Sequence, residues 1–325
     1  MNVYLLLVHQ YTSHLPRLVD ALGSGVYVHA CRSREPLDRL IRQRLGVATV
    51  SKRFRGNWGG FGIVEATVEG LRQVLAENAG CTHVTLLSGA DFPVKPRKDY
   101  ENHLQAHPGR SFVKYWDLYP FDGPENDPQN PWHATAHIQK LRLTRYYFDA
   151  FGRRYSVPPV DSQGYMEFSS PVRRLKHYLK YGGKAFTGNR REELFQLRAS
   201  FRLSWPRPVP AERIYGGSQW WTLCREHAQY VVDTHDREPG LREFFRHTML
   251  PDEMYFQTIL LNGPFRDRIV NDNLRYIRFP AGSSHPLTLT MADYDTLRTG
   301  TAFFARKFDG TESLELIEQL KKHVL

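Results

Sequence analysis

Cysteine is scarce in this sequence, and long apolar runs are absent. The three cysteines among 325 residues, Cys31, Cys81 and Cys224, are far apart and show no CxxC or Cys/His ligand spacing. This pattern predicts neither a disulfide framework nor a structural zinc site, and it favours a reducing compartment. No stretch approaches the roughly 20 consecutive apolar residues that a membrane helix needs, and the first residues lack the features of a signal peptide. We therefore expect a cytoplasmic protein.

Glycine-rich phosphate loops are also absent. The sequence contains no GxGxxG and no GxxxxGK[ST] pattern, which disfavours a nicotinamide-dependent or P-loop enzyme. It shows no RNP, KH or zinc-finger signature, so we expect no nucleic-acid partner. The formal net charge of +10 nevertheless favours an anionic partner, either a phosphorylated small molecule or the anionic inner face of a membrane, contacted peripherally. A surface that is merely solvated by excess arginine explains the charge equally well.

Acidic metal motifs are limited to one DxD triplet, Asp293-Tyr294-Asp295. Such a triplet can help to hold a divalent cation, but this one comes shortly after the TLTM segment, and an Asp that comes after a Thr more often begins a helix. We therefore expect no metal site. Without a metal, a bound diphosphate needs basic side chains, and the otherwise apolar run FFARKFD supplies Arg306 and Lys307.

Strand-like and helical patterns alternate over the first 115 residues. The strand-like segments cover residues 3–9, 26–30, 47–52, 83–89 and 111–116, and a long apolar stripe at helical spacing ends near Gly80. This alternation predicts an α/β fold with a mostly parallel, Rossmann-type sheet flanked by helices. Ligands of such sheets bind beyond the carboxyl ends of the strands, which here include residues 29–32 and 88–91.

The part of the chain after residue 116 has a different composition. Residues 117–135 are rich in Pro, Asp, Asn and Gly and predict a long loop, of the kind that often serves as a lid over a substrate. We expect a second irregular stretch at 200–221. Further predicted elements are helices at 225–233, 251–261 and 311–323 and a strand at 274–279.

Two short segments that are rich in small residues lie at the ends of predicted elements, one after a strand and one before a helix. In LLSGADFPVK, residues 86–95, the small residues that begin at Ser88 let a ligand approach the backbone closely, while Asp91 can reach a ligand hydroxyl or a metal. A tight turn closed by Asp91 is an equal alternative. In NWGGFG, residues 57–62, Trp58 and Gly59 precede the long helix. Flexible backbone there can hold an anion or a sugar hydroxyl, or it can simply redirect the chain.

A third segment, YGGSQWWTL, has the composition of a carbohydrate site. Aromatic rings stack on the apolar side of sugars while Ser and Gln side chains bind hydroxyls, which makes Gly217, Ser218, Gln219, Trp220 and Trp221 candidate sugar contacts. Adjacent residues of a strand point to opposite faces, so we expect one Trp to belong to the core.

Taken in order, NWGGFGIVEAT, LLSGADFPVK, GGSQWWTL, PDEMYFQTIL and FFARKFD resemble the core-2/I-branching glycosyltransferases, a family that includes peptide O-xylosyltransferases. The resemblance implies one GT-A-like domain over residues 1–325, with a nucleotide-sugar-binding half at 1–120 and an acceptor and catalytic half at 121–325. It implies an inverting, metal-independent transfer of GlcNAc or xylose from a UDP-sugar to a hydroxyl of a glycan or glycolipid acceptor, as in polysaccharide biosynthesis. It implies no cofactor.

The resemblance also assigns roles to single residues. The Glu of the PDE motif, the catalytic base of the family, falls on Glu253, while Pro251 and Asp252 fit a helix start in which Asp252 caps the first turn. The Lys of the KFD motif, which binds the diphosphate, falls on Lys307. Asp91 falls in the donor region. For Glu253, a helix N-terminus would lower the pKa of the carboxyl and burial would raise it, and the sequence leaves the outcome open.

Other assignments are less direct. The family's second strand commonly ends in His-Val-Asp, whose Asp contacts the uridine, and this sequence places His29 and then Cys31 there. A second basic ligand of the diphosphate has no single counterpart, so we consider Arg278 and Arg306.

Residues 137–148, HIQKLRLTRYYF, fall at the acceptor side of the family. This makes Lys140, Arg142 and Arg145 candidate acceptor contacts. The alternative is an amphipathic helix with solvated basic residues.

Two alternatives to the main interpretation remain. The donor can be UDP-xylose or carry another nucleotide, because Cys31 replaces the uridine-binding Asp. The chain can also be a non-catalytic carbohydrate-binding protein that keeps the same fold.

Overall fold

A seven-stranded sheet forms the centre of the structure, a computed structural model that describes residues 1–32, 36–56, 59–120, 136–150, 153–157, 207–280 and 285–324. Its strands are β1 (Asn2–Val8), β2 (Val26–Ala30), β3 (Ala48–Thr49), β4 (His83–Ser88), β6 (Ser111–Tyr119), β9 (Ile214–Cys224) and β10 (Ile269–Val270). They are ordered β10-β6-β9-β4-β1-β2-β3. The five strands expected from the first 115 residues are all present.

Six of these strands are mutually parallel, and β9 runs against them. β1 pairs in parallel with β2 and β4, β2 with β3, and β6 with β10, whereas β9 is antiparallel to both of its neighbours, β4 and β6. The predicted α/β fold with a mostly parallel sheet is therefore confirmed. Because β9 is reversed, its first residues lie at the edge where the parallel strands end.

The irregular stretch expected at 200–221 is wrong in its second half, because residues 214–221 belong to β9. The paired glycines there resemble a turn in composition. One of them, Gly217, instead serves close packing between strands, since a Cβ on it would lie 2.1 Å from the carbonyl oxygen of Lys114.

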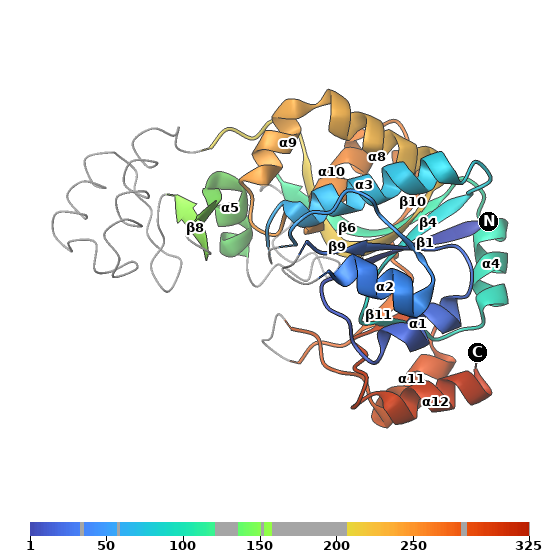
Figure 1. Cartoon of the computed structure of the whole chain (residues 1–325). Helices are drawn as coiled ribbons and strands as arrows, with labels where there is room; N and C mark the ends of the chain where they lie inside the picture. The colour runs from blue at the N-terminus through green and yellow to red at the C-terminus, as the bar shows by residue number, and fades with distance from the viewer. Residues whose placement is uncertain are drawn as a thin grey trace.

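Helices cover both faces of the sheet (Figure 1). One face carries α3 (Gly62–Glu77), α8 (Arg225–Arg237), α9 (Pro239–Arg246) and α10 (Tyr255–Asn262), and the other carries α1 (Leu15–Leu22), α2 (Leu37–Leu45), α4 (Arg97–Ala106), α11 (Tyr294–Thr299) and α12 (Leu314–His323). Side chains of β1 alternate between the two resulting cores, with Val3 and Leu5 in the first and Tyr4 and Leu6 in the second. The helices expected near 225 and 311 are confirmed as α8 and α12.

Smaller elements extend this framework. β5 (Asp91–Pro93), β11 (Arg275–Ile277) and β12 (Phe304–Arg306) form a second sheet ordered β11-β12-β5, which confirms the strand expected at 274–279. α5 (Ala136–Thr144) leads into the hairpin of β7 (Tyr146–Ala150) and β8 (Arg153–Val157). β6 occupies the start of the loop expected at 117–135, and the rest of that predicted lid, residues 121–135, lies outside the described residues.

The helix expected at 251–261 is interrupted. Residues Pro251–Glu253 form a separate 3-10 turn, and α10 begins only after Met254, whose φ of −136° is not helical. The expected capping role of Asp252 is wrong, because neither the turn nor α10 has a side-chain cap. The chain enters the turn through Leu250 in a left-handed conformation, and the Asp252 side chain is buried instead.

In the part of the chain that the structure describes, no helix combines the length and the apolar character needed to cross a bilayer.

Candidate active site

Contacts between β5, β9 and β12 bring three of the motif segments together. β12 pairs antiparallel with β5, which sets Arg306 opposite Asp91, and the amide of Phe308 donates a hydrogen bond to the carbonyl of Ala90 at 2.8 Å. The guanidinium of Arg306 lies over the ring of Trp220, 4.5 Å from its centroid. The segment FFARKFD therefore contacts both of the other two segments, LLSGADFPVK and GGSQWWTL.

Asp91 closes a turn at the end of β4. Its Oδ2 accepts hydrogen bonds from the backbone amide and the hydroxyl of Ser88, each at 2.5 Å, and the Ser88 hydroxyl accepts one from the Ala90 amide at 3.1 Å. This is the tight turn that the sequence offered as an alternative. The side chain is fully buried, and its Oδ1 has no hydrogen-bond partner among the described residues. A donor-binding role for Asp91 stays a prediction.

The three basic candidates for a diphosphate differ in their surroundings. Lys307 is exposed, and its ammonium group has no hydrogen bond or ion pair within the described parts of the chain. Arg306 is held on Trp220. Arg278 forms an ion pair with the buried carboxylate of Asp293 at 3.1 Å, so much of its charge is already neutralised. Lys307 and Arg306 thus fit an anionic ligand better than Arg278.

The DxD triplet begins a helix, as the sequence predicted. Asp293 and Thr290 form a reciprocal capping box around the 3-10 turn Met291–Asp293, which leads into α11. Within the described ranges, no group of three or more His, Cys, Asp or Glu residues is arranged to hold a metal ion.

His29 and Cys31 both contact the loop that follows β3. Nε2 of His29 accepts a hydrogen bond from the Phe54 amide at 3.0 Å, and burial lowers the pKa of its imidazole to about 4, which keeps the ring neutral at physiological pH. The Cys31 thiol accepts a hydrogen bond from the Gly56 amide at 3.2 Å. These side chains position the segment leading to Trp58, which itself lies outside the described residues.

The glycine turn before α3 contacts the segment before the PDE motif. The carbonyl of Gly59 accepts a hydrogen bond from the Leu250 amide at 3.0 Å. Gly59 has a φ of +70°, and a Cβ there would lie 3.1 Å from Cε of Met249. The backbone conformation thus favours glycine, and any side chain there would also displace the end of Met249.

Arg142 holds the same segment from α5. Its Nε donates a hydrogen bond to the carbonyl of Met249 at 2.9 Å, and its Nη2 donates to the carbonyl of Leu250 at 2.9 Å and to Oε2 of Glu253 at 3.0 Å. Nη1 donates to Oε1 of Gln139 at 2.6 Å. With a side chain only 5% exposed, Arg142 is part of the interior.

The alternative of solvated basic residues on this helical segment is therefore wrong for Arg142 and for Arg145, which is also fully buried. Lys140 is exposed, as that alternative expects. Binding of an acceptor by these three residues stays a prediction.

Glu253 combines partial exposure with an unusual electrostatic environment. Burial raises the pKa of its carboxyl above the ordinary value, and the nearby Arg142 guanidinium opposes but does not cancel this effect. Its side chain remains 31% exposed. Oε2 is bound by Arg142, while Oε1 has no hydrogen bond to any described residue. Burial is the largest cause of the shift, and Glu253 is not in the first turn of α10, which begins at Tyr255.

The segment of β9 beside the PDE turn is fixed by Gln257 of α10. The amide of Gln257 donates a hydrogen bond to the carbonyl of Ser218 at 2.6 Å. Trp221 is completely buried against Phe256, as expected for a core residue, but Trp220 belongs to the same buried cluster, so the expectation that only one of the two is in the core is wrong. Trp220 is covered by Arg306 and is 7% exposed. Sequence reasoning missed Gln257, although an amide inside the apolar stretch YFQTILL was a usable signal.

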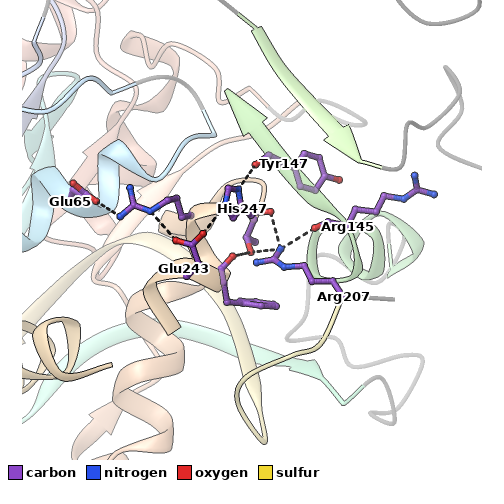
Figure 2. Close-up of polar contacts among 9 residues, drawn as sticks. Glu65, Arg145, Tyr147, Arg207, Glu243 and His247 are labelled. Atoms are coloured by element: carbon purple, nitrogen blue, oxygen red, sulfur yellow. Dashed lines mark hydrogen bonds and ion pairs between the residues drawn. The ribbon is translucent and has the colours of Figure 1, made fainter. Parts of the chain in front are cut away.

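A network of polar contacts attaches α5 and β7 to the end of α9 (Figure 2). Nη1 of Arg207 donates to the carbonyls of Arg145 and His247 at 2.9 and 2.8 Å, and its guanidinium stacks on Phe244. The Tyr147 amide donates to the carbonyl of His247 at 2.9 Å. These contacts fix the helix that carries Arg142, and sequence reasoning missed them.

Comparison with known proteins agrees with this arrangement. Residues 191–299, which include β9 and the PDE turn, match the family model "Core-2/I-Branching enzyme". Xylosyltransferase oxt of Drosophila melanogaster is 25% identical over 337 residues, covering 94% of this chain and 31% of the relative. The chain is thus similar to core-2/I-branching enzymes over residues 191–299 and to a xylosyltransferase over most of its length. The resemblance carried by the five sequence motifs is thereby confirmed.

Other xylosyltransferases match a shorter part of the chain. Xylosyltransferase 2 of Rattus norvegicus is 34% identical over 137 residues, which cover 36% of this chain and 16% of the relative. Xylosyltransferase 1 of the same species is 31% identical over 127 residues, which cover 34% and 15%. The chain spans less than a third of the length of each of these relatives.

Proposed function

We propose that this protein is an inverting glycosyltransferase of the core-2/I-branching type that moves xylose or GlcNAc from a UDP-sugar to an acceptor hydroxyl without a metal ion. The observation that carries the proposal is the state of Glu253: a carboxylate held through one oxygen by Arg142, with a raised pKa and its second oxygen available. The names of the xylosyltransferase relatives support xylose as the first donor to test.

Glu253 supplies the general base in this mechanism. An acceptor hydroxyl is a weak nucleophile, so it transfers its proton to Oε1 of Glu253 while its oxygen attacks the anomeric carbon. The bond from that carbon to the UDP oxygen breaks on the opposite face, which inverts the configuration. Because a carboxylate with a raised pKa is a stronger base, the burial of Glu253 favours this step.

Fixed cations take the negative charge of the departing UDP. Lys307 is exposed and has no partner among the described residues. The guanidinium of the adjacent Arg306 is anchored over the ring of Trp220. Preorganised cations of this kind stabilise a leaving diphosphate without reorganisation during the reaction. Asp91 and His29 would then lie on the side of the donor nucleotide, and the partly exposed Ser218 and Gln219 would contact the sugars.

Turnover of a panel of donors tests the proposal. Release of UDP would be measured for UDP-xylose and UDP-GlcNAc with hydroxyl-bearing peptide and glycoside acceptors, in excess EDTA, alongside binding of UDP, GDP and CMP by calorimetry. We expect transfer to persist in EDTA and NMR of the product to show a β-anomer from an α-linked donor. Activity lost in EDTA and restored by manganese would contradict the metal-free mechanism. Failure of every nucleotide to bind would favour the carbohydrate-binding alternative.

A further inference from the structure

The direction of the Glu253 side chain is set by contacts that come from a distant part of the sequence. We propose that Arg142 is the positioning residue of this site: it fixes the Met249–Leu250 backbone and one oxygen of Glu253, so that only the other oxygen meets the acceptor. This inference rests on the proposed function and replaces direct acceptor binding as the role of Arg142.

The first support is the distribution of the hydrogen bonds that Arg142 makes. Nε and Nη2 together reach two consecutive carbonyls, those of Met249 and Leu250, and the same Nη2 reaches Oε2 of Glu253. A planar guanidinium can serve acceptors in this fixed arrangement, whereas the single ammonium of a lysine cannot. Arg142 therefore couples the backbone before the turn to the carboxylate at its end.

The second support is the backbone of Leu250. Its φ of 52° and ψ of 56° place a bulky residue in the left-handed region, which is unfavourable for any residue except glycine. The strained residue is held on both sides, since Gly59 accepts from its amide and Arg142 donates to its carbonyl. Strain of this kind persists only where surrounding contacts enforce it. Here those contacts set the direction of the turn Pro251–Glu253, which follows Leu250.

The third support is that Arg142 is itself anchored. Its side chain is 5% exposed, Gln139 accepts from its Nη1, and the α5 segment is attached to residues 247 and 248 through Arg207 (Figure 2). A buried, anchored guanidinium is suited to holding a neighbour in place rather than to following a mobile acceptor.

Two substitutions and a matched control test the proposal. Arg142→Gln removes both the positive charge and the planar set of guanidinium donors. Arg142→Lys keeps the charge but removes that set of donors. Arg72→Gln removes an arginine from another carboxylate pair, with Asp236 on the surface, where Arg72 donates two hydrogen bonds of 2.9 Å. For each protein, kcat and the acceptor KM would be measured across pH, and the Glu253 carboxyl would be titrated by ¹³C NMR, assigned with Glu253→Gln.

We expect Arg142→Gln to lower kcat roughly 10- to 100-fold, the cost of a base displaced by about 1 Å, with an acceptor KM within about 3-fold of the wild type. The acid limb of its kcat–pH profile should move to higher pH, because the substitution removes a cation that favours the ionised form of Glu253. Arg142→Lys should lower kcat while keeping the limb near its wild-type pH, and Arg72→Gln should change neither. Should Arg142→Gln fail to fold, Arg142→Lys decides the question by its kcat.

Two results would overturn the proposal. One is an increase confined to the acceptor KM, which would restore the acceptor-binding role. The other is a Glu253 titration in Arg142→Gln that coincides with that of the wild type. The titration needs no substrate, so a wild type that transfers no sugar would refute the proposed function while the role of Arg142 was still decided.

Discussion

At the scale of single residues, the burial of Glu253 makes its carboxylate a stronger base and lowers the stability of the folded protein. Burial raises the pKa of its carboxyl in the folded protein, so over the interval between the unfolded and folded pKa values the folded state binds more protons than the unfolded chain. Stability then falls as the pH rises through that interval, and the cost is fully present above it. A neutral side chain of the same shape avoids this cost.

Glu253→Gln should therefore raise the midpoint of thermal unfolding at pH 7, and the gain should shrink as the pH is lowered towards 4, where the wild-type carboxyl is also neutral. Differential scanning calorimetry at several pH values measures this. Glu318→Gln, at an exposed position on α12, serves as the control and should show no such trend. A Glu253→Gln protein that is less stable than the wild type at pH 7 would refute a penalty from burial.

At the scale of elements, the contact between α3 and β1 depends on Gly70. A Cβ at this mid-helix position would lie 2.6 Å from both δ-methyl groups of the fully buried Leu5. An alanine gains up to about 1 kcal/mol in helix propensity, but overpacking of a core typically costs about 1–3 kcal/mol. The helix therefore carries a glycine because the sheet lies so close.

Gly70→Ala should lower the free energy of unfolding of the wild type by about 1–2 kcal/mol. In a Leu5→Ala background the same substitution should instead raise it, by about 1 kcal/mol, since the added methyl group fills part of the cavity. Chemical denaturation of the four proteins gives both values. Equal effects in the two backgrounds would show that Gly70 and Leu5 do not compete for space.

Elements that depend on local patterns could be predicted from the sequence. The apolar runs of β1, β2 and β4 and the stripe of α3 were sufficient, because burial imposes their periodicity. The break at Met254 and the first half of β9 could not be found in this way. The former depends on Leu250 being held from outside its own segment, and the latter contains glycines that serve strand packing rather than a turn.

At the scale of the whole molecule, the candidate site is assembled from segments that are far apart in the sequence. Arg142 and Glu253 are separated by 111 positions, and no local pattern indicated that they would meet. The motif resemblance located Glu253, Lys307 and the β9 segment, because these carry recognisable residue patterns. Contacts that only the fold creates, such as the Arg306–Trp220 stacking, could not be predicted.

The central claim is that Glu253 acts as the base of a glycosyl transfer, and its most direct test is the rate of transfer by Glu253→Gln compared with Asp252→Asn. Single-turnover transfer from the active UDP-sugar and UDP affinity would be measured on the same preparations. We predict that Glu253→Gln binds UDP with wild-type affinity and transfers at least 100-fold more slowly, whereas Asp252→Asn, which alters a buried side chain outside the proposed machinery, mainly loses stability. A Glu253→Gln protein that transfers sugar at close to the wild-type rate would contradict the account.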